Sequence, residues 1–402
     1  MKIIFPFSVF CAVSFCSRAD SWTQKKDYPA PVGDAVSFSI NGKGYVGTGC
    51  CYRKDFYEYD PVSDTWTQKA DLPGVGRTSA VGFAIGDKGY IGPGQDSDST
   101  NTHEFWEYDP VTNYWTEKAI FQGDERQEAF AFAIAGNGYV GTGYLDPNLL
   151  DDFWKYSQLT DAWSKKTVFQ GGPRVGAVGF SIGDKGYVGM GLTDFAYQDD
   201  LWEYDPATNA WSQKSDFGTI GRATGVAFSI NGLGYVGLGA THDGSWIYLH
   251  DLWQYNPSTN SWVQKTNFPG GAGIAAIAFV IDNKAYVGTG SSPGTSGTDF
   301  WEYTPDSTGT LVEEQVVNKT KLTISPNPII NSSTISFYLN KHSSTTLDLL
   351  ESSGRKIKTL LDANTEAGTH ELQLNREQLS AGIYFLQVKM NDETLVMKIV
   401  IQ

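Results

Sequence analysis

The stretch NGKGYVGTGCCYRKDFYEYDPVSDTW, residues 41–66, decides the fold of this chain, because versions of it recur as far as residue 306. Its first half returns as GDKGYIGPG at 86–94, and its second half returns as EFWEYDPVTNYW at 104–115. Six copies are present, each marked by one tyrosine: Tyr45, Tyr90, Tyr139, Tyr187, Tyr235 and Tyr286. Such self-similarity indicates one small structural unit that packs against its own copies.

Each copy predicts four short strands. In the first copy, residues 34–40 are small and apolar, residues 44–48 are aromatic and β-branched, and residues 55–59 and 65–69 alternate in polarity. An Asn-Gly pair separates the first two segments and an Asp-Pro pair separates the last two, as in hairpins. A four-stranded sheet alone leaves both faces apolar and its edges open, so we expect the sheets to stack around an axis.

The Gly pair, the aromatic pair and the closing Trp, at a period of about 50 residues, resemble the kelch repeat, in which each copy makes one blade of a β-propeller. The resemblance implies an all-β fold with a six-bladed kelch-type propeller over residues 20–306. Residues 20–29 (DSWTQKKDYP) match the fourth strand of the first full copy at 64–73, whereas the sixth copy stops after its third strand. We therefore expect an N-terminal strand, residues 21–25, to close the ring.

The composition argues against several functional classes. The net charge is −15 and the isoelectric point is about 4.7, which argues against a nucleic-acid partner because phosphate binding requires a basic surface. After the N-terminus, no apolar stretch reaches the roughly 18 residues of a membrane-spanning helix. Nothing supplies four zinc ligands at finger spacing. We expect a monomer without cofactor or metal.

The N-terminus is typical of a secretory signal peptide over residues 1–19. One lysine precedes an apolar run, and small residues stand at the expected cleavage site. The mature chain would then begin at Asp20. The alternative is a lipoprotein acylated at Cys16, although the bulky Phe15 stands where a small side chain is needed.

Cleavage at this site would leave Cys50 and Cys51 as the only cysteines of the mature chain. A disulfide between neighbouring residues is strained, because their Cα atoms lie closer together than an ordinary disulfide prefers. The pair is therefore either a reducible vicinal disulfide or two thiols.

An acidic residue stands before the aromatic pair of every copy. Because a binding site in a pseudo-symmetric ring is made by departures from the repeat, we expect these carboxylates to satisfy backbone amides six times over, rather than to perform chemistry. The six are Asp55, Glu104, Asp152, Asp200, Asp251 and Asp299.

Four copies carry an arginine six residues before the phenylalanine of the first strand, while Val32 and Gly273 take this place in the first and last copies. First strands line the channel of a propeller, so the guanidinium groups should converge near one channel mouth. In kelch propellers basic residues at this place often bind anionic partners, which implies an acidic glycan or protein ligand. The alternative is that each arginine pairs with a nearby carboxylate or carbonyl group. The four are Arg77, Arg126, Arg174 and Arg222.

The loops between second and third strands differ most among the copies, and variable loops on a rigid scaffold are common binding sites. Several contain aspartates, so calcium binding is an alternative to solvated carboxylates, although no loop has the regular ligand spacing of a calcium loop. The candidate binding residues of these loops are His103, His242, Trp246, Tyr248 and His250.

No nucleophile elbow, zinc-protease motif or phosphate-binding loop is present. We therefore expect a secreted or cell-surface propeller that binds a glycan or protein. The alternative is a carbohydrate-acting enzyme, because a sialic-acid mutarotase is also a secreted six-bladed kelch propeller. A deep pocket with a carboxylate or histidine from only one or two blades would favour the enzyme, and a wide mouth lined by arginine and aromatic residues would favour binding.

After a linker at 307–322, residues 323–402 contain short alternating segments that predict a small β-sandwich. This segment resembles the type A C-terminal sorting domain of the type IX secretion system of Bacteroidetes. The resemblance implies contact with the secretion machinery, export across the outer membrane, and release or surface attachment after the tail is removed. The residues that carry it are Pro326, Asn327, Pro328, Gly354, Arg355, Gly382 within LSAGIYF, and Lys398.

Overall fold

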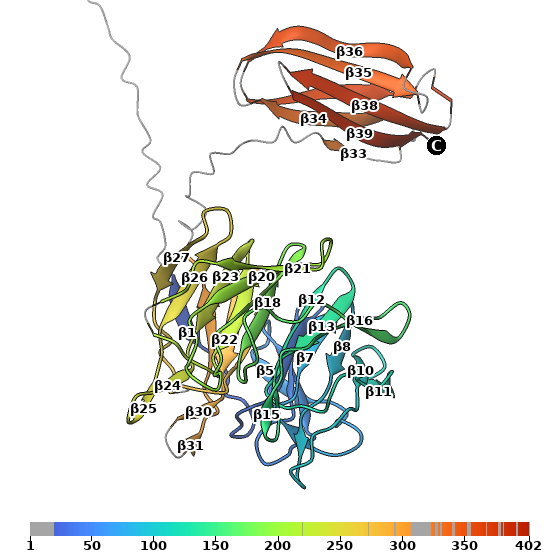
Figure 1. Ribbon diagram of the computed structural model, residues 1–402. Helices are drawn as coiled ribbons and strands as arrows, with labels where there is room; N and C mark the ends of the chain where they lie inside the picture. Colours follow the sequence, from blue (N-terminus) through green and yellow to red (C-terminus); the bar gives the residue numbers. More distant parts are fainter. Residues whose placement is uncertain are drawn as a thin grey trace, which may run out of the picture. The chain divides into compact units, whose positions relative to one another are not determined.

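The computed structural model divides the chain into two compact units, residues 1–307 and 308–402. The expected signal peptide and linker lie outside the residues that the structure describes. Every helix or strand element among the described residues is a strand (Figure 1). The described residues are 20–306 without 219, 272, 293 and 294, and then 323–325, 329, 332–339, 342–351, 355–366, 368–376, 379–380, 382–390 and 393–401.

The described part of the first unit contains six four-stranded antiparallel sheets. The first sheet is β2 (Val36–Ile40), β3 (Lys43–Gly47), β4 (Phe56–Asp60) and β5 (Thr65–Gln68), and the second is β7 (Gly82–Ile85), β8 (Lys88–Ile91), β10 (Trp106–Asp109) and β11 (Tyr114–Glu117). The third is β12 (Phe130–Ile134), β13 (Asn137–Gly141), β16 (Phe153–Ser157) and β17 (Ala162–Lys165), and the fourth is β18 (Val178–Ile182), β19 (Lys185–Gly189), β20 (Leu201–Asp205) and β21 (Ala210–Lys214). The fifth is β22 (Val226–Ile230), β23 (Leu233–Gly237), β26 (Leu252–Asn256) and β27 (Ser261–Lys265), and the sixth is β28 (Ile277–Ile281), β29 (Lys284–Gly288), β32 (Phe300–Thr304) and β1 (Ser21–Gln24).

The turn residues explain the tight first hairpin of each sheet. Asn41 and Gly42 both have positive φ angles, 49° and 75°, which a two-residue hairpin turn requires at both positions. The turn sets Ile40 opposite Lys43, and this register places alternate side chains of β2 in the core.

In five of the six copies a glycine stands before the marker tyrosine and packs against a phenylalanine ring of the preceding sheet, whereas the sixth copy has Ala285 at this place. A methyl group on Gly89 would lie 2.2 Å from the ring of Phe38 in the preceding sheet, and one on Gly138 would lie 2.2 Å from the ring of Phe83. The phenylalanine of each first strand therefore lies over the backbone of the next sheet. This contact explains why a Gly and a Phe recur together in the repeat.

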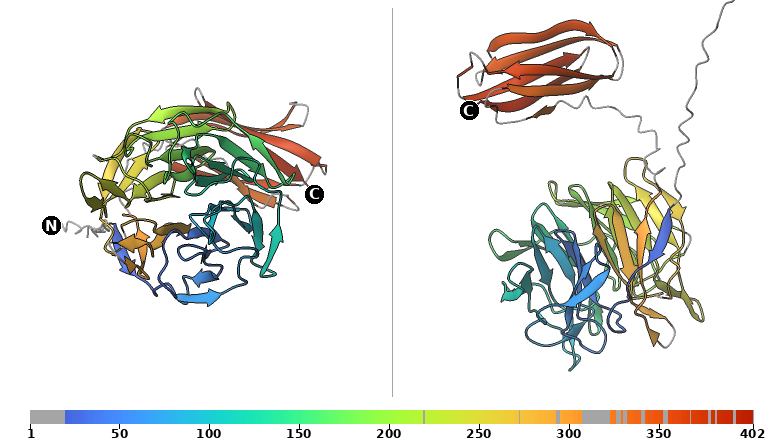
Figure 2. Two further views of the ribbon diagram at one scale, coloured as in Figure 1. Left: turned by 60° about the horizontal axis from the view of Figure 1, so that its bottom comes forward. Right: turned by 180° about the vertical axis from the view of Figure 1, so that it is seen from behind.

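The sixth sheet takes its outer strand from the N-terminus. β1 pairs antiparallel with β32, and Trp22 lies opposite Tyr303. In Figure 2 the dark blue β1 lies beside the orange strands of the sixth sheet. The first strands also contact one another in a closed order: β2 with β7, β7 with β12, β12 with β18, β18 with β22, β22 with β28, and β28 with β2.

Neighbouring sheets are also fastened by the tryptophan of the fourth strand. The indole N–H of Trp66 donates to the carbonyl oxygen of Lys26, which follows the outer strand of the sixth sheet, at 2.9 Å. Trp22 makes the same bond to the carbonyl oxygen of Thr266, which follows the outer strand of the fifth sheet, at 3.0 Å. Asp20 accepts hydrogen bonds from the backbone N–H of Thr266 and the hydroxyl of Tyr303. Equivalent pairs of bonds are accepted by Asp64, Asn113, Asp161, Asn209 and Asn260.

Four short two-stranded pairs lie beside the sheets: one joins the segment that enters a first strand to the segment that leaves a second strand, and three lie between second and third strands. Figure 1 shows two of them, β24–β25 and β30–β31, extending from the same end of the six sheets. We call this end the loop-bearing face. The pairs are β6 (Arg77–Thr78) with β9 (Gln95–Asp96), β14 (Tyr144–Leu145) with β15 (Asn148–Leu149), β24 (Ala240–His242) with β25 (Trp246–Tyr248), and β30 (Ser291–Ser292) with β31 (Thr295–Ser296).

The second unit consists of two antiparallel sheets that share one apolar core. Leu347, Leu386 and Ile335 are fully buried in this core. One sheet has the order β33 (Thr323–Ser325), β34 (Ser332–Leu339) and β37 (Gly368–Asn375). The other has the order β36 (Lys356–Thr365), β35 (Ser343–Glu351), β38 (Gly382–Met390) and β39 (Glu393–Ile401).

Candidate functional site

The four arginines of the repeat are fully buried. The guanidinium group of Arg126 donates to both carboxylate oxygens of Asp152, at 2.6 and 2.9 Å, and to the carbonyl oxygen of Thr142 at 2.9 Å. The guanidinium carbon of Arg126 also lies 4.8 Å from the centre of the Phe121 ring. Burial opposes ionisation of Asp152, but the hydrogen bonds and charge of Arg126 outweigh it and hold the pKa of this carboxyl below its ordinary value.

The same arrangement holds the other three arginines. Arg174 pairs with Asp200 and Arg222 with Asp251, whereas Arg77 pairs with Glu104. The acidic residues of the repeat therefore bind guanidinium groups in these four sheets, and not mainly backbone amides. These contacts correspond to the alternative in which the arginines are scaffold. They do not form a cationic channel mouth, because their side chains are enclosed and their charges are matched.

In the first and sixth sheets, which lack the arginine of the repeat, other groups bind the acidic residue. In the first sheet, Arg53 from the loop binds Asp55 through two hydrogen bonds of 2.7 Å. In the sixth sheet, Asp299 accepts from the backbone N–H of Gly271 and from the indole of Trp301. Gly273 stands where other sheets have arginine, and a side chain there would meet Cβ of Tyr248 at 2.7 Å.

Three of the loop candidates meet on one hairpin. His242 in β24 lies directly opposite Trp246 in β25, with ring centroids 5.3 Å apart and ring planes at 75°. Tyr248 follows two residues after Trp246, at a centroid distance of 6.5 Å. The side chain of Trp246 is 57% exposed, whereas Tyr248 is half-buried against the sixth sheet. We call His242, Trp246 and Tyr248 the aromatic ladder.

The other two loop histidines lie apart from the ladder. His103 contacts the carboxylate of Glu125 at 3.4 Å. His250 belongs to the connection into β26, and its carbonyl oxygen accepts a hydrogen bond from the backbone N–H of Phe268. A separate exposed ring, Phe195, lies in the corresponding loop of the fourth sheet and is 96% exposed.

The cysteine pair and the loop aspartate Asp96 make local contacts. No disulfide joins Cys50 and Cys51, and the sulfur of Cys50 accepts a hydrogen bond from the backbone N–H of Gly33 at 3.3 Å. Asp96 caps its own loop by accepting from the backbone N–H groups of Asp98 and Thr100. Within the described residues, no group of three or more His, Cys, Asp or Glu side chains comes together as metal ligands would.

A ring of backbone hydrogen bonds surrounds the entrance to the channel between the first strands. Six residues, one from each sheet, each donate from their N–H to the carbonyl oxygen of the residue in the sheet before, at 2.9–3.2 Å, and this chain of bonds closes on itself. All six have positive φ angles, from 50° to 65°. Because this strained conformation recurs in every sheet, it belongs to the scaffold. The six residues are Asp34, Ser79, Glu128, Gly176, Thr224 and Ala275.

These six residues line a hollow of about 160 Å³, which we call the axial mouth. Asp34 and Glu128 are its two charged residues, and no Lys or Arg lines it. Burial, and then the charge of Asp34, raise the pKa of Glu128 to about 7, and burial also raises the pKa of Asp34. Sequence reasoning missed this pair, although each lies four residues before the phenylalanine of its first strand, at the position of the repeat where all six copies differ.

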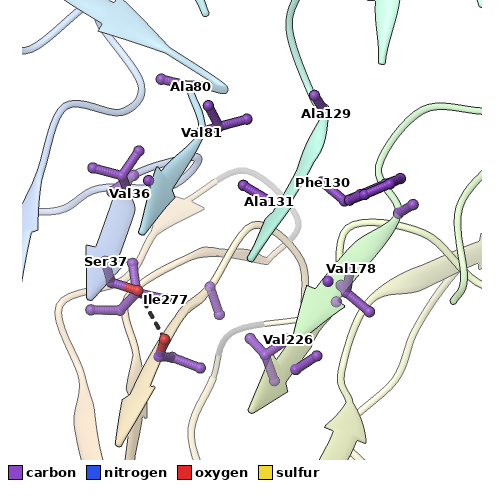
Figure 3. A pocket seen from close by; sticks show the side chains of 18 residues that line it. Val36, Ser37, Ala80, Val81, Ala129, Phe130, Ala131, Val178, Val226 and Ile277 are labelled. Atoms are coloured by element: carbon purple, nitrogen blue, oxygen red, sulfur yellow. Dashed lines mark hydrogen bonds between the residues drawn. The ribbon is translucent and has the colours of Figure 1, made fainter. Parts of the chain in front are cut away.

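Below the mouth, most of the side chains that line the channel are small or apolar. Figure 3 shows its lining, where small and aliphatic side chains such as Ala80, Val178 and Ile277 surround a space of about 170 Å³. The hydroxyl of Ser37 donates to the carbonyl oxygen of Ala278, at 3.0 Å. The polar side chains that a ligand can meet on the axis are therefore concentrated at the mouth.

Among the sorting residues, Arg355 is exposed and binds Glu351, and Gly382 begins β38. Lys398 lies in β39 opposite Phe385. The candidates Pro326, Asn327, Pro328 and Gly354 lie outside the described residues.

Comparisons with known proteins found a matching family and a similar solved structure that bear on this chain. Residues 323–402 match the family of secretion system C-terminal sorting domains. Proteins with this domain are exported by the type IX secretion system to the cell surface or the medium, so this chain is an exported protein that interacts with that machinery. Among the described residues, no helix is long and apolar enough to cross a membrane.

The fold of the first unit is similar to that of a solved structure, YjhT, which is a kelch-type propeller. The TM-score is 0.62 at 18% sequence identity, and the match covers 69% of this chain and 95% of YjhT. This similarity is one of fold alone. A search of curated proteins found no match.

Proposed function

We propose that this protein is an exported propeller that binds an extracellular glycan or peptide through its loop-bearing face. In this proposal the six sheets are the blades of one kelch-type propeller, residues 20–306, and β1 closes the ring. The closed order of contacts among first strands and the closed ring of hydrogen bonds at the mouth support this arrangement.

The aromatic ladder is the observation that carries the proposal. The ring of Trp246 is exposed to solvent on a short, hydrogen-bonded hairpin, and it offers a rigid apolar surface. Ligand binding to this ring costs little conformational entropy, because the side chain has few rotatable bonds. Its faces can stack on the apolar side of a sugar ring or on an apolar peptide side chain. The scaffold does not require this exposure, because the fourth-strand tryptophans Trp115 and Trp211 are only 4% and 5% exposed.

An array of glycans and peptides probed with the purified protein tests this function. We expect binding to one group of related ligands, and we expect Trp246→Ala to abolish it. Tyr114→Ala is the matched control, because Tyr114 is an exposed aromatic residue, 67% exposed, on the outer strand β11. Equal binding by both variants, or no binding by the parent protein, would reject the proposal.

A carbohydrate-acting enzyme is the second candidate, because the carboxylates of the axial mouth come from only two of the six sheets. Glu128, with its raised pKa, fits a general acid or base near neutral pH. An acidic sugar such as sialic acid fits poorly, since both mouth carboxylates would repel it. Rates of anomer exchange for neutral and acidic sugars, measured by NMR with the parent protein and Glu128→Gln, test this candidate. No acceleration by the parent protein would reject it.

A further inference from the structure

The axial mouth brings two carboxylates together without a matching cation. No described side chain donates a hydrogen bond or forms an ion pair with Asp34 or Glu128, and no basic residue lines the hollow. Both carboxylates are partly exposed to the hollow, whereas the fully buried arginines of the repeat are each paired with a carboxylate. The mouth carboxylates therefore differ from the arginines in two ways: no cation among the described residues pairs with them, and a ligand can reach them.

Two hydroxyl groups of the mouth, those of Thr224 and Ser79, can also accept a hydrogen bond from a positively charged donor. The hydroxyl of Thr224 donates to the carbonyl oxygen of Ala223, so its oxygen is left to accept. Ser79 provides a second hydroxyl at the same level of the ring. The N–H groups of the six ring residues are consumed by the ring of hydrogen bonds, so they do not stabilise an anion there.

We propose that the axial mouth binds a primary ammonium group of a ligand, between the carboxylates of Asp34 and Glu128 and the hydroxyls of Ser79 and Thr224. An ammonium group has three donors, which this set of acceptors can satisfy. A calcium ion is less well served, because it takes six to eight oxygen ligands and the mouth offers two carboxylates and two hydroxyls. The hollow of about 160 Å³ admits such a group.

The proposal reverses the sign of the ligand expected from the arginines. An anionic ligand would meet two negative charges at the mouth, and the nearest guanidinium groups are enclosed with their own carboxylates. The ammonium group can belong to an amino sugar or to a lysine side chain. The mouth lies on the same face as the aromatic ladder but shares no residue with it, so the two proposals can fail separately.

Titrations with matched probes test the proposal. Glucosamine is compared with glucose, and Nα-acetyl-lysine is compared with its Nε-acetylated form, by calorimetry or NMR. We expect the charged member of one or both pairs to bind at least about tenfold more tightly than its neutral counterpart. The pair that shows this difference identifies the source of the ammonium group.

Variants then locate the binding. Asp34→Asn and Glu128→Gln should each weaken ammonium binding at least about fivefold, while Asp184→Asn, at a carboxylate that is 84% exposed, should leave it unchanged. Binding should also weaken from about pH 7.5 to about pH 5.5, as Glu128 takes up a proton. Melting temperatures check that the variants are folded.

Three outcomes would overturn the proposal: no probe binds, the neutral probes bind as well as the charged ones, or Asp184→Asn weakens binding as much as the mouth variants do. The last would indicate general attraction to an acidic protein. Trp246→Ala should leave ammonium binding unchanged, which separates this inference from the function proposed for the ladder.

Discussion

A guanidinium group that leaves water is stable only where its charge and donors are matched, and Arg126 meets both conditions. We expect Arg126→Ala to lower the free energy of unfolding by roughly 3–5 kcal/mol, because it leaves the carboxylate of Asp152 half-buried without its cation. Denaturant unfolding measures the change.

The control for this prediction is Arg53→Ala. Arg53 makes a similar pair with Asp55, but its side chain is 28% exposed, so the loss should be about 1 kcal/mol or less. Equal losses in the two variants would show that burial is not what makes the Arg126 pair important.

Glu128 predicts a pH dependence of stability. Its pKa in the folded protein, about 7, lies above that of an unfolded glutamate. As pH rises from about 4 to 7 the unfolded chain loses this proton first, so the carboxylate progressively destabilises the fold. We expect Glu128→Gln to melt like the parent protein near pH 4.5 and several degrees higher near pH 8. A difference independent of pH would contradict the environment assigned to Glu128.

Sequence reasoning found the positions of the arginines and left two roles open, ligand binding or pairing with a nearby carboxylate or carbonyl group. The sequence shows their spacing from the phenylalanine of the first strand. Whether the side chain of Arg126 points toward the channel or toward its own carboxylate depends on the tertiary structure, which the spacing does not determine. The position two residues after the arginine, occupied by Asp34 and Glu128 in their copies, carried the clearer signal, because a charged residue stands there in only two copies. Departure from the repeat, more than charge itself, marks the candidate site.

At the scale of elements, β1 covers the edge of β32 in the sixth sheet. Trp22 packs edge-on against Phe268 and lies 4.9 Å from the centre of the Tyr303 ring. We expect Trp22→Ala to destabilise the protein by roughly 2–4 kcal/mol, at the lower end for a tryptophan because the ring is only half-buried. Deletion of residues 20–29 should cost more, since it exposes the edge of β32.

Both variants are measured by thermal and denaturant unfolding. Lys54→Ala, at a surface position of the first sheet's loop, serves as the neutral control. Unchanged melting of the deletion variant would contradict the role of β1 as the outer strand of the sixth sheet.

The elements were more predictable than the loops. The Asn-Gly turns and alternating segments indicated the four strands of each copy, because these signals are local. The hairpin of β24 and β25 was expected only as a variable loop, although Asp243-Gly244 is a turn signal between its strands and Gly244 has a φ of 72°. The pairing of His242 with Trp246 follows from that turn.

At the scale of the whole molecule, the tail directs export and the first unit carries the proposed binding. Truncation after residue 322 should leave a folded first unit in the periplasm, because the sorting domain is missing. Immunoblots of periplasm, cell surface and medium, with the melting temperature as a check of folding, measure the result. Normal amounts outside the cell would contradict the role of the tail.

The proposed function requires the ligand to contact the loop-bearing face. Hydrogen exchange, measured with and without the ligand found by the array, shows which segments the ligand covers. We predict that the ligand slows exchange in residues 239–250, the segment of the aromatic ladder. We predict no change in the exchange rate of the turns at 60–64 and 109–113, which join third to fourth strands. Protection confined to those turns or to the outer strands would contradict the claim.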